Sequence, residues 1–147
     1  MASHEKETVA VWKSGTAFDI TAGSGGTVIS DGDAQAGMSP MEMLLAALAG
    51  CTGADVIDIL RKKRQEVTRF EVRVSGERPE MHPRVYTAIE VTYIVTGRGI
   101  DPAAVRRAIE LSEGKYCSVS AMLCKTAKLS TKFEVHEAEA AKAEAQA

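Results

Sequence analysis

The run from Met43 to Leu60 constrains the fold more than any other segment, because apolar residues occupy every face of the helix that it predicts. Ser39 suits the N-cap of this helix, Pro40 its first position and Glu42 its third position, which together make a capping box. A helix that is apolar all round requires burial, either in a core or in a subunit interface. In a chain of 147 residues, a central helix shared with a partner subunit is an attractive solution.

Alternating apolar and polar residues predict strands at 8–13, 17–21, 27–30, 70–75, 85–95 and 129–135. Glycine-containing turns separate the first three, which predicts an antiparallel meander. A second helix is expected from the Asp101 cap and Pro102 onward, and a short third helix after Cys117. This order of elements indicates an α+β fold. The length predicts a single domain over 1–147, with a core at 8–136 and a frayed or disordered tail at 137–147.

The charge gives little support to nucleic-acid or membrane binding. The net charge is −2, and the basic cluster 61–64 is interpreted as the last turn of a helix, with a nucleic-acid patch as the alternative. Thr52, Asp55 and Asp58 interrupt the most apolar window, so we expect no membrane span. The polar N-terminal residues do not resemble a signal peptide, and with three cysteines in the chain we expect a cytoplasmic protein.

The cysteines are the candidates for chemistry. Cys51 lies inside the apolar helix and is expected to be shielded, whereas Cys117 opens a short helix whose dipole, with Lys115 and Lys125 nearby, would favour a thiolate. A buried thiol and a thiol at a helix mouth are what a two-cysteine redox centre needs. The competing interpretation is that both are structural. Cys124 is expected to fill the core, with a resolving thiol as its alternative role.

Other polar residues carry weaker signals. Thr52 and Asp55 place polar atoms in an apolar segment, which hints at a pocket, although Asp55 can instead face solvent. Glu42 is explained by the capping box alone. The three histidines and three cysteines have no metal-ligand spacing, so neither a metal nor an organic cofactor is expected.

Three segments together resemble one known family. They are SPMEMLLAALAGCTGADV (39–56), HPRVY (82–86) and EGKYCSV (113–119). They are similar to motifs of the OsmC/Ohr family, and the resemblance extends over nearly all of 9–136. It implies an OsmC-like fold: an intertwined homodimer with central helices packed between antiparallel sheets and with active sites at the dimer interface.

The resemblance also implies a function. Family members are peroxiredoxin-like thiol peroxidases that reduce organic hydroperoxides in the oxidative stress response. By motif, Cys51 would be the peroxidatic thiol, Cys117 the resolving thiol, and Glu42 the glutamate at the start of the site helix. A dithiol reductant such as a lipoylated protein would reduce the resulting disulfide.

The chain departs from the family pattern in two ways. Ohr-type enzymes use an arginine from the N-terminal region, held by the helix glutamate, whereas no arginine precedes Arg61 here. Glu42 also lies one position later than usual, because Met41 occupies the expected place. Arg78 and Arg84 are the substitutes we consider. The alternative function is therefore a non-catalytic or slow redox-sensing module that binds a small apolar molecule on the same scaffold.

Overall fold

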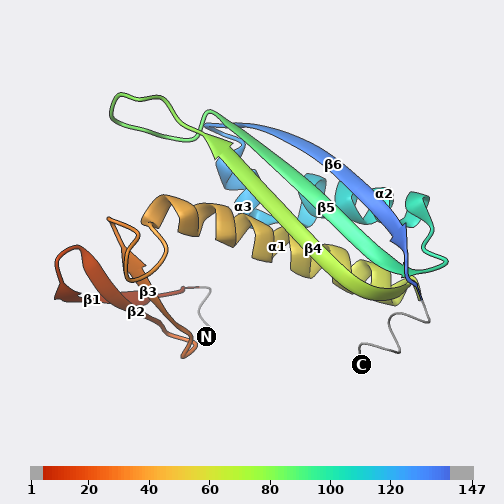
Figure 1. Cartoon of the computed structure of the whole chain (residues 1–147), viewed down its shortest axis with the longest axis horizontal. Coiled ribbons are helices and arrows are strands. Elements are labelled where there is room, and N and C mark those ends of the chain that lie inside the picture. Colours follow the sequence, from red (N-terminus) through yellow and green to blue (C-terminus); the bar gives the residue numbers. More distant parts are fainter. Residues whose placement is uncertain (1–4, 140–147) are drawn as a thin grey trace. The chain divides into compact units, whose positions relative to one another are not determined.

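The computed structural model describes residues 5–139 and divides into two compact units, one ending at Leu44 and one beginning at Leu45. Figure 1 shows the elements in chain order. They are β1 (Thr8–Ser14), β2 (Ala17–Ala22), β3 (Thr27–Asp31), α1 (Pro40–Lys62), β4 (Glu66–Glu77), β5 (Ala88–Arg98), α2 (Pro102–Leu111), a π-helical turn η1 (Ser112–Tyr116), α3 (Ser118–Leu123) and β6 (Lys128–Glu137). The α+β prediction is confirmed, and the last residues of the predicted tail, 140–147, lie outside the described part of the chain.

The first unit contains the predicted meander. β1, β2 and β3 pair antiparallel in that order, and Gly15 makes the first turn with φ of 54°, a conformation that favours glycine. Few of its apolar side chains are buried within this chain. Val9, Val11 and Trp12 of β1 are all more than half exposed.

A carboxylate organises the loop after β3. Asp31 is buried and accepts a hydrogen bond from the Thr16 hydroxyl at 2.5 Å. It also accepts bonds from the backbone amides of Asp33, Gln35 and Ala36. These bonds, with the one from Thr16 as the largest contribution, lower the pKa of Asp31 to about 2.

The second unit contains the sheet β4–β5–β6, with helices on one of its faces (Figure 1). β4 and β5 are antiparallel, but β6 runs parallel to β5. The expectation of purely antiparallel sheets is therefore wrong for this sheet. The connection between β5 and β6 carries α2 and α3, and a crossover connection of this length is what a parallel pair requires.

The core of the second unit lies between this sheet and the helices. Ile89, Val91, Tyr93 and Val95 alternate along β5 and are at most 1% exposed. Opposite them, one side of α1 buries its residues at every fourth position, Leu48, Thr52, Val56 and Leu60. Gly53 of α1 faces the sheet, since a Cβ there would lie 3.4 Å from the Val72 side chain, an ordinary van der Waals contact.

Only one side of α1 is buried within this chain, so the expectation that the helix is covered all round is not met in the single chain. α1 is also the one helix of the described residues that is long and apolar enough to cross a membrane, two properties that central helices of folded cores commonly share.

Candidate functional site

Cys117 lies at the junction between η1 and α3. It is the N-cap of α3, with extended backbone angles, and its sulfur accepts a hydrogen bond from the Ser120 amide at 3.3 Å. Its own amide donates to the Ser112 carbonyl at 2.7 Å. The predicted position at a helix mouth is confirmed, and the side chain is only 3% exposed.

Burial decides the protonation of Cys117. Burial raises the pKa of this thiol, and the hydrogen bond from the Ser120 amide only partly offsets that effect. The expectation that the helix dipole and nearby lysines make Cys117 a ready thiolate is therefore wrong. Lys115 places its ammonium group over the ring of Tyr116, 5.2 Å from the ring centroid.

Cys51 is the neighbour of Cys117. The Cys51 thiol is one of the causes that raise the pKa of Cys117, after burial, so the two thiols lie close together. Cys51 is half-buried, and none of the three cysteines is in a disulfide. The expected burial is reversed, because Cys51 lies beside the buried row of α1, whereas Cys117 at the start of α3 is only 3% exposed.

Cys124 lies apart from the core. It is the C-cap of α3, is exposed, and donates its S–H to the Ala121 carbonyl at 3.2 Å. The prediction of a core position is wrong, because α3 ends at Leu123 and the chain turns outward there.

Glu42 belongs to the first unit, where it completes the predicted capping box. Its carboxylate accepts from the Ser39 amide at 2.9 Å, and its own amide donates to the Ser39 hydroxyl at 3.2 Å. The bond from the Ser39 amide is the main reason that the pKa of Glu42 is lowered. The structure thus confirms the capping role, and a catalytic role for Glu42 stays a prediction.

A group of buried hydroxyls lies close to the cysteines in the sequence, and of its members the sequence analysis named only Thr52. Thr52, which follows Cys51, contacts the Tyr93 hydroxyl at 2.6 Å and the Ser112 hydroxyl at 2.8 Å. All three side chains are fully buried. Thr52 was singled out from its polar atom in an apolar helix, and Tyr93 could have been found as a phenol in the middle of a buried strand face.

A carboxylate lies at each end of this group. The Ser112 hydroxyl donates to Asp55 at 2.9 Å, and the Tyr93 hydroxyl donates to Glu113 at 2.6 Å. Burial, and secondarily the bond to Glu113, raise the pKa of Tyr93 far above its usual range, and Cys117 adds to the shift. Asp55 therefore accepts a hydrogen bond from the buried Ser112, whereas the alternative in the sequence analysis was that it simply faces solvent.

Each end of the chain of hydroxyls opens on a surface depression. Asp55 lines one of about 380 Å³, together with Lys62, Leu111 and Tyr116. Glu113 lines another of about 240 Å³, between α2 and β6. The buried hydroxyls thus join two sides of the second unit.

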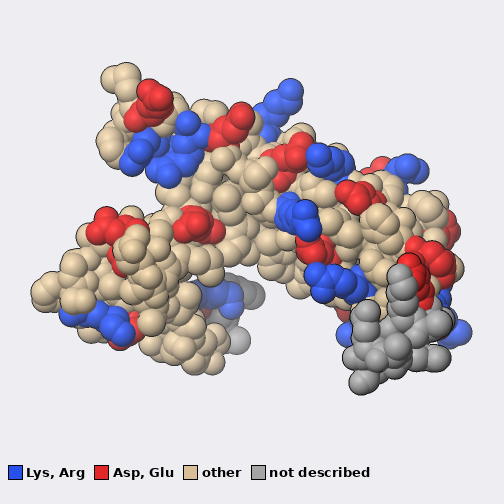
Figure 2. Space-filling view, in the orientation of Figure 1, with Lys and Arg blue, Asp and Glu red and all other residues tan. Residues whose placement is uncertain are grey.

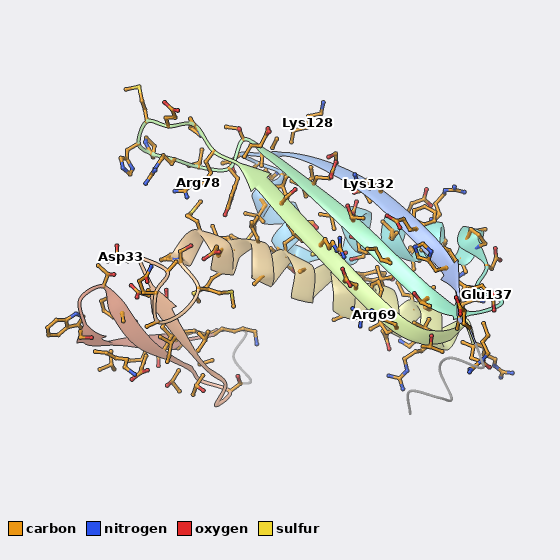
Figure 3. The ribbon with its side chains drawn as sticks, viewed as in Figure 1. Asp33, Arg69, Arg78, Lys128, Lys132 and Glu137 are labelled. Atoms are coloured by element: carbon orange, nitrogen blue, oxygen red, sulfur yellow. The ribbon has the colours of Figure 1, made fainter. Side chains whose placement is uncertain are left out.

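The outer surface of the sheet carries paired charges. Arg69 contacts Glu71 at 2.9 Å, and Lys132 contacts Glu90 at 3.2 Å; Figure 3 labels Arg69 on β4 and Lys132 on β6. Figure 2 shows basic and acidic side chains interspersed over this face. Lys62 ends α1 as predicted and pairs with Asp58 at 2.8 Å. Within residues 5–139, no three His, Cys, Asp or Glu side chains are grouped so as to hold a metal ion.

Comparison with known proteins decides the family. The sequence model for OsmC-like proteins matches residues 31–142, which includes α1, both site cysteines and the whole sheet of the second unit. The chain belongs to the OsmC-like protein family.

The similar proteins agree with this family. Protein YhfA of Escherichia coli K12 is 44% identical over 125 residues, which cover 84% of this chain and 93% of that protein. A protein of Aquifex aeolicus with a solved structure is 34% identical, with a TM-score of 0.85 over 93% of this chain and all of that one. The organic hydroperoxide resistance protein OhrB of Bacillus subtilis shares the fold, with 19% identity and a TM-score of 0.58 over 88% of this chain and 98% of that one.

Of the two arginines considered as substitutes in this OsmC-like protein, Arg78 is engaged elsewhere within the chain. Arg78 donates to the Arg84 carbonyl at 2.7 Å, and its guanidinium lies 6.0 Å from the centroid of the Tyr86 ring. Figure 3 shows Arg78 near the loop that joins β4 and β5. In the single chain these contacts hold the loop together.

Proposed function

We propose that this protein is a thiol-dependent peroxidase that reduces organic hydroperoxides through Cys51 and Cys117. The observation that carries the proposal is the adjacency of the two free thiols, of which one is more exposed and the other is buried with a raised pKa. Family membership and the shared fold of OhrB support it.

The reaction needs one proton and no metal. The Cys51 thiolate attacks the terminal oxygen of the peroxide, the O–O bond breaks, and the alkoxide takes a proton to leave as alcohol. Cys51 becomes a sulfenic acid. The Cys117 sulfur then attacks that sulfur, its proton leaves with the hydroxyl as water, and a disulfide forms. A dithiol such as dihydrolipoamide reduces the disulfide and is itself oxidised.

The division of roles follows from exposure. Because Cys51 is half-buried and Cys117 is 3% exposed, a peroxide reaches Cys51 first. Because burial keeps Cys117 protonated, it waits as a thiol until the sulfenic acid forms beside it. We propose that the cytoplasm supplies the dithiol.

We also propose a homodimer as the working form. The support is the apolar surface that the single chain leaves open: Val9, Val11 and Trp12 of β1 and the uncovered side of α1. A partner subunit would cover these residues and could bring an arginine such as Arg84, or Glu42, to the site. Analytical ultracentrifugation at micromolar concentration should give twice the chain mass, and a monomer would contradict this part.

The test of the peroxidase is a turnover assay. Reduced protein is mixed with cumene hydroperoxide and dihydrolipoamide, and peroxide loss is followed together with the mass of the protein. We expect turnover in the wild type, none in Cys51→Ser, and in Cys117→Ser a sulfenic acid that dimedone traps. A Cys124→Ser variant is the matched control and should keep its activity. Wild-type consumption no faster than that of Cys51→Ser would end the proposal.

A second candidate is a slow redox-sensing or non-catalytic module that binds a small apolar molecule. The observations that favour it are the lack of an arginine before Arg61 and the raised pKa of Cys117. Native mass spectrometry of the purified protein separates the two candidates. A bound lipid-like molecule with slow thiol oxidation favours the module, and an empty protein that oxidises rapidly favours the enzyme.

A further inference from the structure

The buried hydroxyls between Asp55 and Glu113 have fewer protons than contacts. Four O···O contacts run in line: Asp55 to Ser112 at 2.9 Å, Ser112 to Thr52 at 2.8 Å, Thr52 to Tyr93 at 2.6 Å and Tyr93 to Glu113 at 2.6 Å. Each hydroxyl supplies one hydrogen, so the three hydroxyls supply three. If both carboxyl groups are ionised, one contact lacks a hydrogen.

A contact without a hydrogen is costly here. Two hydroxyl oxygens 2.6–2.8 Å apart with no proton between them face each other with lone pairs, in a region where all three hydroxyl side chains are fully buried. Thr131 does not supply the missing hydrogen, because its hydroxyl donates to Glu113 from outside the line, at 2.7 Å. The geometry is satisfied only by a fourth proton.

With four protons the line has two equivalent arrangements. In one, Asp55 holds the proton and every hydrogen bond points towards Glu113. In the other, Glu113 holds it and every bond points towards Asp55. If the hydrogen in each contact passes from its donor oxygen to its acceptor oxygen, one arrangement becomes the other. The net result is that a proton is carried from one end of the line to the other. The raised pKa of Tyr93 keeps the phenol neutral, as such a relay requires.

The two ends lie where a relay would be useful. Asp55 follows Cys51 by four residues in α1, and side chains with this spacing are neighbours on one side of a helix, about 5–6 Å apart at Cβ. Asp55 also borders the depression lined by Lys62 and Tyr116. Glu113 borders the separate depression between α2 and β6.

We propose that this line is a proton relay that serves the peroxide-cleaving step at Cys51. Asp55 gives its proton to the alkoxide released when the Cys51 thiolate breaks the O–O bond. The line then shifts by one contact, and Glu113 takes a proton from solvent. When the disulfide is reduced again, Asp55 takes the proton lost by the Cys51 thiol, Glu113 releases its proton to solvent, and the line returns to its first state. The delivery of the proton to the alkoxide rests on the proposed peroxidase function, whereas the presence of a fourth proton in the line, which we call the stored proton, does not.

The stored proton is tested by infrared spectroscopy of the reduced protein in D2O at neutral pH, without peroxide. We expect the carbonyl stretch of a protonated carboxyl in the wild type, which Asp55→Asn and Glu113→Gln both remove. In each variant the side-chain amide supplies the fourth hydrogen, so the remaining carboxylate can ionise. Asp58→Asn is the matched control on α1 and should keep the band. A wild type without the band, or a band unchanged in both variants, overturns the relay.

Stability measurements test the fourth proton in a second way. Asp55→Asn should unfold at a denaturant midpoint close to that of the wild type, because its amide completes the line, whereas Asp55→Ala should unfold at a clearly lower one. Equal losses in the two variants would mean that the line needs no extra hydrogen, and the relay would be wrong.

The use of the proton is tested by the rate of Cys51 oxidation in a single turnover with cumene hydroperoxide. Glu113→Gln blocks uptake from solvent, and Tyr93→Phe interrupts the line. We expect each to slow the step by about 10²-fold, the lower end of what positioned acid catalysis contributes. Glu110→Gln, at the same depression, is the control and should react at the wild-type rate.

The failures can be told apart. If wild-type Cys51 does not react with peroxide although the infrared band is present, the proposed peroxidase is wrong and the stored proton stands. If Cys51 reacts quickly and both relay variants react equally quickly, the peroxidase stands and the relay to Cys51 is overturned.

Discussion

In the second unit, β5 hides four consecutive inward side chains behind α1, whereas in the first unit β1 leaves all of its residues exposed. Both regions have strands with the same alternation of apolar and polar residues. The difference teaches that alternation fixes a strand and its two faces, but not whether anything covers either face. The second unit covers its apolar face with its own helices, and the first unit leaves its apolar residues largely exposed in the single chain.

The largest effect is expected from opening the core of the second unit. Ile89→Ala should lower the free energy of unfolding by about 2–5 kcal/mol, because the side chain is 1% exposed and the cavity cannot fill. The measurement is urea unfolding followed by circular dichroism.

The matched control for that substitution is Ile29→Ala in β3. Ile29 is 36% exposed in the single chain, so the loss of unfolding free energy in Ile29→Ala, measured in dilute protein, should be clearly smaller. Equal losses at both positions would break the contrast between the units, because Ile29 would then be as well covered as Ile89.

A middle-sized effect is expected from the buried hydroxyls. Thr52→Val keeps the shape of the side chain but removes the hydroxyl that contacts both Tyr93 and Ser112, which should cost about 1–3 kcal/mol although Glu113 and Asp55 remain as partners. Thr21→Val, on an exposed position of β2, is the control and should stay within about 0.5 kcal/mol of the wild type. A neutral Thr52→Val would show that the hydroxyl line adds nothing to the core.

The N-caps allow a closer comparison between the units. Ser39→Ala removes the cap of α1 and Asp101→Ala the cap of α2, and each should cost about 1 kcal/mol in thermal or urea unfolding. The two losses should be similar, since a cap acts locally. A much larger loss at Ser39 would indicate that the start of α1 does more than cap a helix.

These caps also show what the sequence alone can predict. Ser39, Pro40 and Glu42, like Asp101 and Pro102, satisfy backbone groups within one turn, so their pattern predicts the helix starts correctly. The meander is a local pattern too, and its prediction is confirmed. The strand expected at 85–95 is present as well, but it lies three residues later, at Ala88–Arg98.

The wrong predictions concern partners distant in the sequence. The burial of Cys51 and Cys117 depends on how α1 and α3 lie against the sheet, and the parallel direction of β6 depends on the path of the chain through α2. Tyr93 and Thr52 are 41 residues apart in the sequence, so no local pattern predicts their contact. Local rules predicted the elements, and tertiary packing decided the surroundings of the site.

The smallest effect is expected in the loop that Asp31 holds. The pKa of this carboxyl is about 2 in the folded chain and 3.8 in its ordinary state, so the carboxylate form is favoured by folding. Its contribution is complete above about pH 4 and is lost as the pH falls towards 2. Hydrogen exchange at the amides of Asp33, Gln35 and Ala36 should therefore lose protection over this range, while the β5 amides stay protected.

Two variants sharpen this last comparison. Asp31→Asn keeps an acceptor but not the charge, so its loop amides should be less protected at neutral pH and nearly independent of pH between 4 and 2. Asp19→Asn removes an exposed carboxylate, paired with Lys13 at 3.4 Å, from the neighbouring strand and should leave the pH response of the loop unchanged. If the β5 amides lost protection together with the loop amides, acid would be unfolding both units at once. The contrast between the two units would then not hold for acid unfolding.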